Sequence, residues 1–308
     1  MTKGVAMANK KLVNLLLQDE NANVANDEFE TLSGSDWVRL LSKKPQFADK
    51  CNRNEITDDN GAPITVSYWR KLTGKQWSDL LIKQPQFADK CDWNKISECH
   101  LFQLLDKCKD IIDKIEINEL PTPLIALLLS QQPQFADKCD KWNDFASTDW
   151  ASLLSDQPQF ADKCDKWGEF DGSNWSILLS CQPQFADKCN KWSEFNTTDW
   201  CGLLERQPQF ADRCDKWKEF YSYDWGSLLS DQPQFADKCD KWEEFDATDW
   251  SWLLRYQPQF VDKCNFSKFN SEDWSWFLYN WNEFSKVLKT HLLLSQPQLA
   301  KYFSEGNN

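Results

Sequence analysis

Apolar residues recur along the middle of the chain with a fixed step of 25 residues, and this pattern dominates the sequence. Within one step, Trp150, Leu153 and Leu154 stand at positions i, i+3 and i+4, so they share one face of a predicted helix. Pro158 follows this run and ends the helix, and Phe160 belongs to the segment that comes next. The pattern therefore predicts one short helix and a tight turn in each unit.

Whole phrases keep the same step. The phrase Q-P-Q-F-A-D-K-C recurs, with small lapses, around six phenylalanines: Phe135, Phe160, Phe185, Phe210, Phe235 and Phe260. The run W-x-x-L-L opens with five equally spaced tryptophans: Trp150, Trp175, Trp200, Trp225 and Trp250. A fixed period between 20 and 50 residues is typical of a solenoid, whose units stack and bury a continuous core.

Diverged copies extend the repeat toward both ends of the chain. Residues 1–28 carry an atypical, more polar unit, which we interpret as an N-terminal capping repeat. Residues 29–280 are predicted to form a solenoid of about ten repeats. Residues 281–308 are predicted to form a C-terminal capping helix and tail, with a last partial phrase at Gln296-Pro297-Gln298-Leu299.

Two longer steps interrupt the regular spacing. Residues 57–66 contain the tight-turn sequence Asp59-Asn60-Gly61 between β-branched residues, which predicts a hairpin or loop inserted into one repeat. Residues 109–120 place an apolar residue at every core position, so they predict the core of a diverged repeat and exclude a linker.

A one-residue deletion indicates where the helical part of a unit ends. Cys91-Asp92-Trp93 lacks the lysine of Cys164-Asp165-Lys166-Trp167, yet the apolar spacing after the tryptophan is preserved. Because a deletion inside a helix rotates everything after it by about 100°, we expect the helix to end near the cysteine and an extended piece to follow. Units of 24–25 residues, mostly α-helical with one short extended segment, predict a leucine-rich-repeat-like solenoid. An all-α solenoid of short helices is the alternative.

The phrase W-x-x-L-L-x-x-Q-P-x-F resembles leucine-rich repeats in plan and length, although the asparagine of that family's signature is missing. The fuller phrase, continued to Q-P-Q-F-A-D-K-C, is similar to tandem repeats in uncharacterised bacterial proteins over most of the chain. This resemblance implies a solenoid and brings no known activity, cofactor or site residue.

The cysteines add information on the compartment. Eight of the 12 occupy one repeat position: Cys51, Cys91, Cys139, Cys164, Cys189, Cys214, Cys239 and Cys264. A ladder of small side chains at equivalent positions indicates buried, reduced thiols and not a disulfide framework. Reduced thiols, together with the lack of a signal-peptide pattern or a bilayer-length apolar stretch, favour a cytoplasmic protein.

Charge and motif content narrow the function classes. A net charge of −13 disfavours nucleic acid and anionic membranes as direct partners and leaves basic proteins as candidates. The chain has no phosphate-binding loop or nucleophile elbow and only two histidines, so we expect no enzyme, no metal and no cofactor. The prediction is a monomeric scaffold, adaptor or inhibitor that binds proteins through its repeat surface.

One candidate surface lies near the C-terminal end of the repeats. Two pairs of helix positions vary from unit to unit, directly after the tryptophan and directly before the first glutamine. At these positions the later units carry tryptophan, tyrosine and arginine, the side chains enriched at binding hot spots. The predicted partner-binding residues are Trp252, Arg255, Tyr256 and Trp276, with Glu205 and Arg206 at the rim.

A second candidate surface is an acidic edge between the extended piece and the helix. Its carboxylates are Asp144, Glu169, Asp171, Glu194, Glu219, Glu243, Glu244 and Asp246. Such an edge is the basis of the alternative function, an acidic mimic of nucleic acid that inhibits a basic nucleic-acid-binding protein. The recurring Asp-Lys pair, such as Asp187-Lys188, is interpreted as a solubilising surface ladder whose pairs contribute little stability.

Overall fold

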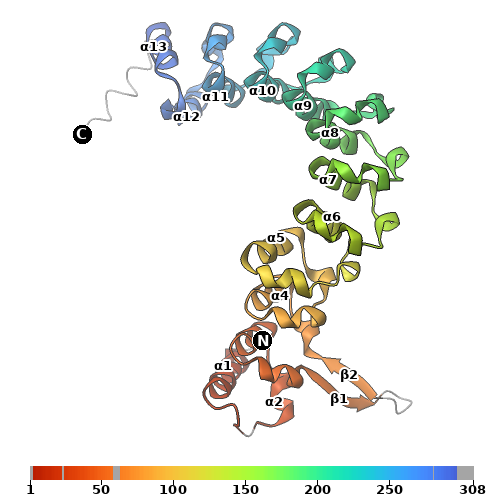
Figure 1. Ribbon diagram of the computed structural model, residues 1–308. Coiled ribbons are helices and arrows are strands. Elements are labelled where there is room, and N and C mark those ends of the chain that lie inside the picture. Colours follow the sequence, from red (N-terminus) through yellow and green to blue (C-terminus); the bar gives the residue numbers. More distant parts are fainter. Residues whose placement is uncertain (1–2, 23, 58–62, 280, 297–308) are drawn as a thin grey trace, which may run out of the picture. The chain divides into compact units, whose positions relative to one another are not determined.

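The computed structural model describes residues 3–22, 24–57, 63–279 and 281–296 (Figure 1). The chain divides into two bodies, an N-terminal body of Met1–Phe145 and a C-terminal body of Ala146–Asn308. The last partial phrase from Pro297 onward and the predicted Asp59-Asn60-Gly61 turn lie outside the described residues.

The described residues of the N-terminal body form six α-helices and one pair of strands. Its helices are α1 (Lys3–Gln18), α2 (Asn26–Glu30), α3 (Gly34–Leu41), α4 (Gly74–Leu81), α5 (Glu98–Lys107) and α6 (Thr122–Gln131). Strands β1 (Asn52–Thr57) and β2 (Pro63–Ser67) pair antiparallel, with Asn52 opposite Ser67 and a bulge between Asn54 and Ile56. The hairpin comes from the segment that breaks the repeat spacing (Figure 1). In the diverged repeat, Ile111 takes the place of the repeat phenylalanine and is fully buried.

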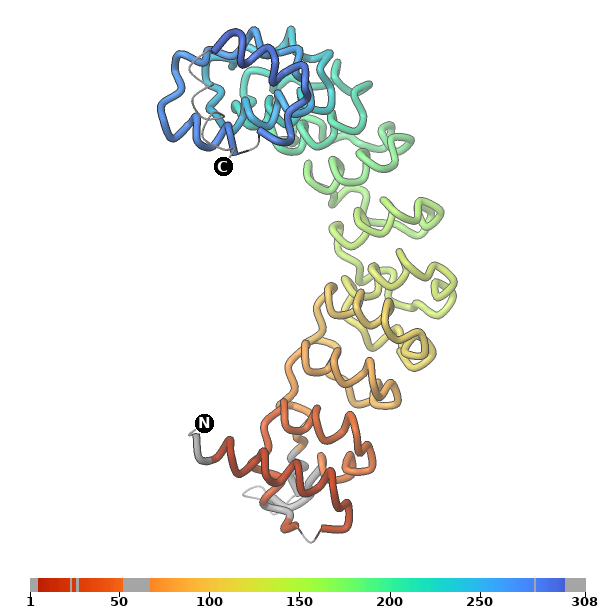
Figure 2. The backbone as a smooth tube through the Cα atoms, turned by 90° about the vertical axis from the view of Figure 1, so that its left-hand side faces the viewer, coloured from red at the N-terminus to blue at the C-terminus, as the bar shows by residue number. Residues whose placement is uncertain are grey.

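The C-terminal body holds the most regular repeats. Its helices are α7 (Ser147–Asp156), α8 (Gly172–Cys181), α9 (Thr197–Arg206), α10 (Ser222–Asp231), α11 (Ala247–Tyr256), α12 (Ser271–Tyr279) and α13 (Lys286–Ser295). Figure 2 shows the backbone of successive units following the same path.

One repeat consists of an α-helix followed by two short 3₁₀ helices. After α8, Pro183 begins η11 (Pro183–Lys188), and η12 (Trp192–Glu194) follows before the next helix starts. The start of α8 is fixed by a capping box, in which Asp171 Oδ1 accepts from the Asn174 N–H at 2.8 Å and Asn174 Oδ1 accepts from the Asp171 N–H. The glutamine-proline sequence thus separates the α-helix from the 3₁₀ turn.

The leucine-rich-repeat-like prediction is wrong, and the all-α alternative fits the structure. In the described repeats outside the β1–β2 insertion, no strand forms. Cys189 does have extended backbone (φ −75°, ψ 115°). Its N–H, however, donates to Ala186 O, and the Glu194 N–H donates to Lys191 O. These N–H groups are used by the 3₁₀ turns on either side of the extended residue and cannot pair with a neighbouring strand. The link between the turns is too short to build a ladder with its neighbours.

Each repeat buries a cluster of aromatic rings. Trp200 is fully buried, and Trp192 stacks on it with ring centroids 5.7 Å apart and planes inclined by 21°. Phe195 and Phe210 close the cluster at 5.0 Å from Trp200 and 5.4 Å from Trp192. The same stacked pair recurs at 5.6–5.7 Å as Trp167–Trp175, Trp217–Trp225 and Trp242–Trp250. Aromatic burial of this kind supplies most of the packing free energy.

In the regular repeats, two positions of the helix face the next repeat in the stack, and we call these positions and their equivalents in the other helices the facing positions. They are the first helical residue and the residue after the helix tryptophan. In α8 they are Gly172 and Ser176. A Cβ on Gly172 would lie 2.7 Å from Glu194 O, and Ser176 Oγ donates to Asp199 O at 2.7 Å. The residue after the tryptophan, interpreted from sequence as a variable surface position, is therefore buried and restricted to small side chains in α7–α11.

A ladder of glutamine side chains also joins successive repeats. Gln207 Nε2 donates to Ser180 O of the preceding helix at 2.8 Å, and Gln209 Nε2 donates to Gln207 Oε1 at 2.8 Å. The equivalent rungs run from Gln182 to Ser155 O, Gln232 to Glu205 O and Gln257 to Ser230 O. The two glutamines of Q-P-Q thus have different roles, since the first crosses to the neighbouring repeat and the second orients the first.

We expect Gln207→Ala to lower the free energy of unfolding by about 1–2 kcal/mol, because it removes a cross-repeat hydrogen bond and leaves a part-buried carbonyl without its donor. Gln209→Ala is the matched control. It should change the free energy of unfolding by less than about 0.5 kcal/mol, since Gln209 is exposed and does not reach the neighbouring repeat. Urea unfolding followed by circular dichroism measures both. Equal losses from the two variants would contradict the ladder.

None of the 12 cysteines, all of which the structure describes, forms a disulfide. Nine are buried and Cys91 is half-buried, whereas Cys99 and Cys181 are exposed. Burial raises the pKa of the thiols of Cys164, Cys214 and Cys239 to about 11 and that of Cys51 to about 12. These side chains behave as small apolar core residues and hold little of the reactive thiolate at neutral pH.

Iodoacetamide at pH 8 should modify Cys99 and Cys181 at the rate of a free thiol, and the buried thiols at least about 100-fold more slowly, because only exposed thiolates react. Peptide mass spectrometry over time resolves the individual sites, and addition of guanidinium should equalise their rates. Rapid native modification of Cys164 or Cys214 would show that the ladder is not buried.

Candidate protein-binding surface

Three of the predicted partner-binding residues are exposed aromatic side chains. Trp252 and Tyr256 on α11 are 49% and 48% exposed, and Trp276 on α12 is 51% exposed. Tyr279, which sequence reasoning missed, is 81% exposed on the same helix as Trp276. We refer to these four residues as the aromatic patch.

The rings of the aromatic patch associate in two pairs. Trp252 and Tyr256, four residues apart, meet edge to face with centroids 5.2 Å apart. Trp276 and Tyr279, three residues apart, stack with centroids 6.1 Å apart and planes inclined by 13°. Each pair keeps its rings in a defined orientation while about half of each indole stays open to solvent, so the rings are ordered before a partner arrives.

Arg255 contacts the Trp252–Tyr256 pair through the Tyr256 ring. Its guanidinium lies 5.3 Å from the centre of the Tyr256 ring, and its Nη2 forms a 3.0 Å ion pair with Glu283 Oε2. Arg255 is therefore held beside the patch by two contacts at once. In this position the arginine can donate to a partner only from the side that Glu283 leaves open.

The structure does not bring Glu205 and Arg206 to the aromatic patch. Both belong to α9, and α10 packs between α9 and α11. Glu205 Oε1 accepts from Ser227 Oγ at 2.6 Å and from the Cys201 thiol at 3.4 Å, so this carboxylate joins α9 to α10. Arg206 is exposed at a distance of two repeats from Tyr256 in the stack. The predicted rim is thus a separate feature of the surface.

A third aromatic pair at the start of α10 also went unnoticed in the sequence. Tyr221 and Tyr223 are exposed and stack with centroids 6.0 Å apart and planes inclined by 5°. Other repeats carry small or polar residues at these two positions, and that contrast within the chain would have been the signal.

The acidic edge is largely neutralised by its own lysines. Four of its glutamates pair with the lysine three residues earlier, at 2.9–3.7 Å: Glu169 with Lys166, Glu194 with Lys191, Glu219 with Lys216, and Glu244 with Lys241. The hydrogen bond to the partner glutamate raises the pKa of Lys166 and of Lys241. Asp171 and Asp246 serve as N-caps of α8 and α11. Apart from Asp144, which is exposed, the edge is therefore mainly a row of compensated pairs and caps.

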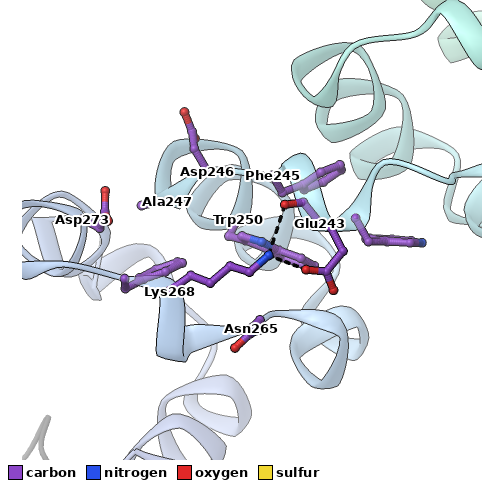
Figure 3. Close-up of a pocket in the computed structure, with 10 residues that line it drawn as sticks. Glu243, Phe245, Asp246, Ala247, Trp250, Asn265, Lys268 and Asp273 are labelled. Atoms are coloured by element: carbon purple, nitrogen blue, oxygen red, sulfur yellow. Dashed lines mark hydrogen bonds and ion pairs between the residues drawn. The ribbon is translucent and has the colours of Figure 1, made fainter.

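Figure 3 shows a pocket of ≈200 Å³ at this edge, between the starts of α11 and α12. Lys268 Nζ reaches across it to the backbone oxygen and the carboxylate of Glu243. Asp246 Oδ1 accepts from the N–H groups of Thr248 and Asp249 at 2.7 and 2.9 Å, and Asp273 Oδ2 accepts from the Asn270 N–H at 2.9 Å. The carboxylates are thus engaged within the protein. Among the described residues, no group of three or more metal-ligating side chains comes together.

The recurring Asp-Lys pair has a role beyond solubility. Lys188 Nζ lies 4.9 Å from the centre of the Trp167 ring in the preceding repeat. The same contact recurs as Arg213 over Trp192, Lys238 over Trp217 and Lys263 over Trp242, at 4.7–4.9 Å. The cation of each repeat therefore covers the indole of the repeat before it, a contact worth about 0.5–1 kcal/mol at an exposed site.

The folded chain is a tandem repeat of short helical units with a regular tryptophan and proline pattern. No protein-family model, curated protein or solved structure matches it. The similarity to uncharacterised bacterial repeat proteins stays a prediction. In the part of the chain that the structure describes, every helix is too short or too polar to cross a bilayer.

Proposed function

We propose that this protein is a non-enzymatic binding module, a scaffold, adaptor or inhibitor, that engages a protein partner through the aromatic patch. The observation that carries the proposal is the half-exposure of Trp252 and Trp276 on neighbouring helices. Large aromatic side chains are normally withdrawn from solvent, and their clustering on a surface marks an interaction site. Tryptophan and tyrosine bury much apolar area at low entropic cost when a partner covers them.

The charge of the chain supports a basic partner. With a net charge of −13, the protein attracts basic surfaces over a Debye length of about 8 Å at physiological salt. Glu272 is exposed close in sequence to the patch and supplies local negative charge, whereas the charge of Glu283 is paired with Arg255. The apolar rings then determine how long the partner stays bound, and the charges determine how fast it associates.

The alternative function, a nucleic-acid mimic, receives less support. A mimic needs a row of unopposed negative charges, whereas four glutamates of the acidic edge are paired with lysines. The two functions differ in salt dependence, since a complex held by apolar rings weakens less with ionic strength than one held by charge alone.

The test compares a triple variant, Trp252→Ala/Tyr256→Ala/Trp276→Ala, with the wild-type protein as bait in affinity capture from the native cells, followed by mass spectrometry. The triple variant should melt within about 3 °C of wild type because its side chains are exposed. It should lose at least about tenfold of the captured partner, since hot-spot truncations cost 2 kcal/mol or more.

The matched control is Tyr221→Ala/Tyr223→Ala, which removes an exposed aromatic pair from α10 and should retain the partner. Undiminished capture by the triple variant would refute the patch as the binding site. A collapse of its thermal stability would show that these residues belong to the core.

A further inference from the structure

The junction between α5 and α6 differs from the other junctions of the repeat. In the repeat of α6, Glu119 stands at the position that Lys95 has in the repeat of α5. The preceding junction has Lys95 Nζ donating to Arg70 O and Leu72 O at 2.8 and 3.2 Å.

The two facing positions of α5 also differ from those of its neighbours. In α4 these positions are Gly74 and Ser78, and in α6 they are Thr122 and Ala126. Every helix from α6 to α12 carries glycine, alanine, serine, threonine or cysteine at both. In α5 they are Glu98 and Phe102, two bulky side chains four residues apart on one helix face. Phe102 is 54% exposed, so its ring does not enter the core.

A cleft opens beside these residues, at the starts of α5 and α6. Its volume is ≈500 Å³, within the range of small-ligand pockets, and its walls are mostly apolar. Ile96 and Leu124 are buried at its base. The mouth carries Glu98, the exposed Cys99, Pro121 and Pro123.

The chemistry of the mouth favours a positive charge. A helix start usually attracts anions through its free N–H groups. At the start of α5, Ser97 Oγ accepts from the His100 N–H and Glu98 already places a carboxylate in the first turn. The start of α6 is Pro121-Thr122-Pro123, and the two prolines have no N–H to offer. Glu98 adds an exposed carboxylate, and no ion pair occupies it among the described residues. The apolar base of the cleft fits an aromatic side chain, and the negative charge at its mouth fits a positively charged group next to that side chain.

We propose that the α5–α6 cleft is a second protein-binding site, which receives one aromatic side chain of a basic peptide segment in a partner protein. The site lies in the N-terminal body and shares no residue with the aromatic patch. It shares with the proposed function only the assumption that the partner is a protein, so each can fail alone.

The experiment uses Cys99 as a reporter of occupancy and Cys181 on α8 as the reference in the same tube, since both thiols are exposed. The purified full chain is treated with iodoacetamide in the presence of 4-phenylbutylamine, and peptide mass spectrometry follows each site. A ligand of this size is expected to bind with a Kd of a few millimolar. At about 10 mM ligand, the rate of modification of Cys99 should fall about threefold, and the rate of modification of Cys181 should not change. Two control ligands separate the contributions of the charge and the ring. 4-Phenylbutyrate has the ring with the opposite charge, butylamine has the charge without the ring, and neither should protect Cys99.

Two variants locate the effect. Glu98→Gln keeps the cleft and removes its charge, so protection by 4-phenylbutylamine should fall by about half or more. Glu98→Ser/Phe102→Ser restores small residues at the facing positions, and protection should disappear as the cleft closes. Circular dichroism checks the fold of each variant. Equal protection by 4-phenylbutyrate, no protection by any ligand, or full protection in the folded double variant would each overturn the proposal.

Discussion

Trp200→Ala should destabilise the protein strongly, as should truncation of the equivalent tryptophans of the regular repeats. The side chain is fully buried, stacks on Trp192 at 5.7 Å and contacts Phe195 at 5.0 Å. Removing a buried tryptophan costs about 3–5 kcal/mol, because the neighbours fill only part of the cavity. For a body of this size, that lowers the melting temperature by an amount on the order of 10 °C.

Two variants calibrate this expectation in thermal unfolding. Trp252→Ala removes the same side chain from an exposed position two repeats later and should shift the midpoint by at most about 3 °C. Trp200→Phe keeps a ring and removes an indole N–H that has no acceptor among the described residues, so it should cost less than the alanine variant. If Trp200→Ala and Trp252→Ala behaved alike, the aromatic clusters would not be the core of the repeat.

Raising the pH from 9 to 11 should destabilise the protein steeply through its buried thiols. The pKa of Cys164, Cys214 and Cys239 is raised from 9.0 to about 11 in the folded protein. The unfolded thiols therefore ionise first, so their contribution is complete below pH 9 and is lost as the pH rises toward 11. The loss is on the order of 1–2 kcal/mol per thiol, after allowance for partial solvent access.

Urea unfolding at pH 8, 9, 10 and 11 measures this dependence. Lysines and tyrosines also titrate in this range, so the comparison that isolates the thiols is between variants. Cys239→Ala should have a shallower loss of stability with pH than wild type, whereas Cys181→Ala, at an exposed position, should follow the wild-type slope. Parallel slopes for Cys239→Ala and wild type would contradict thiol burial as the cause.

The helical half of the repeat could be predicted from sequence because its signals are local. The spacing of Trp200, Leu203 and Leu204 defines one buried face, and all three are fully buried. The prediction for the segment after the cysteine is wrong, since the spacing predicts an extended piece there and Trp192–Glu194 forms a 3₁₀ turn. Hydrogen bonding within this turn, such as Phe195 N–H to Trp192 O, decides the outcome, and sequence spacing does not report it.

Cross-repeat contacts were harder to foresee than the face of a helix. The first glutamine of Q-P-Q recurs at every regular unit, but only the structure shows that it reaches a carbonyl 27 residues earlier. The exposure of Trp252 and Trp276 follows from helix periodicity, whereas the distance of Arg206 from them follows from the width of a whole repeat. Binding at the aromatic patch stays a prediction.

The glutamine ladder has a direction. Gln182, Gln207, Gln232 and Gln257 each donate backward to the preceding helix, and the lysines that cover the indoles also reach back by one repeat. A ribosome delivers the chain from its N-terminus, so each newly emerged repeat brings the donors that fasten it to acceptors already in place. The nascent protein can therefore add one repeat at a time without waiting for the sequence still to be translated.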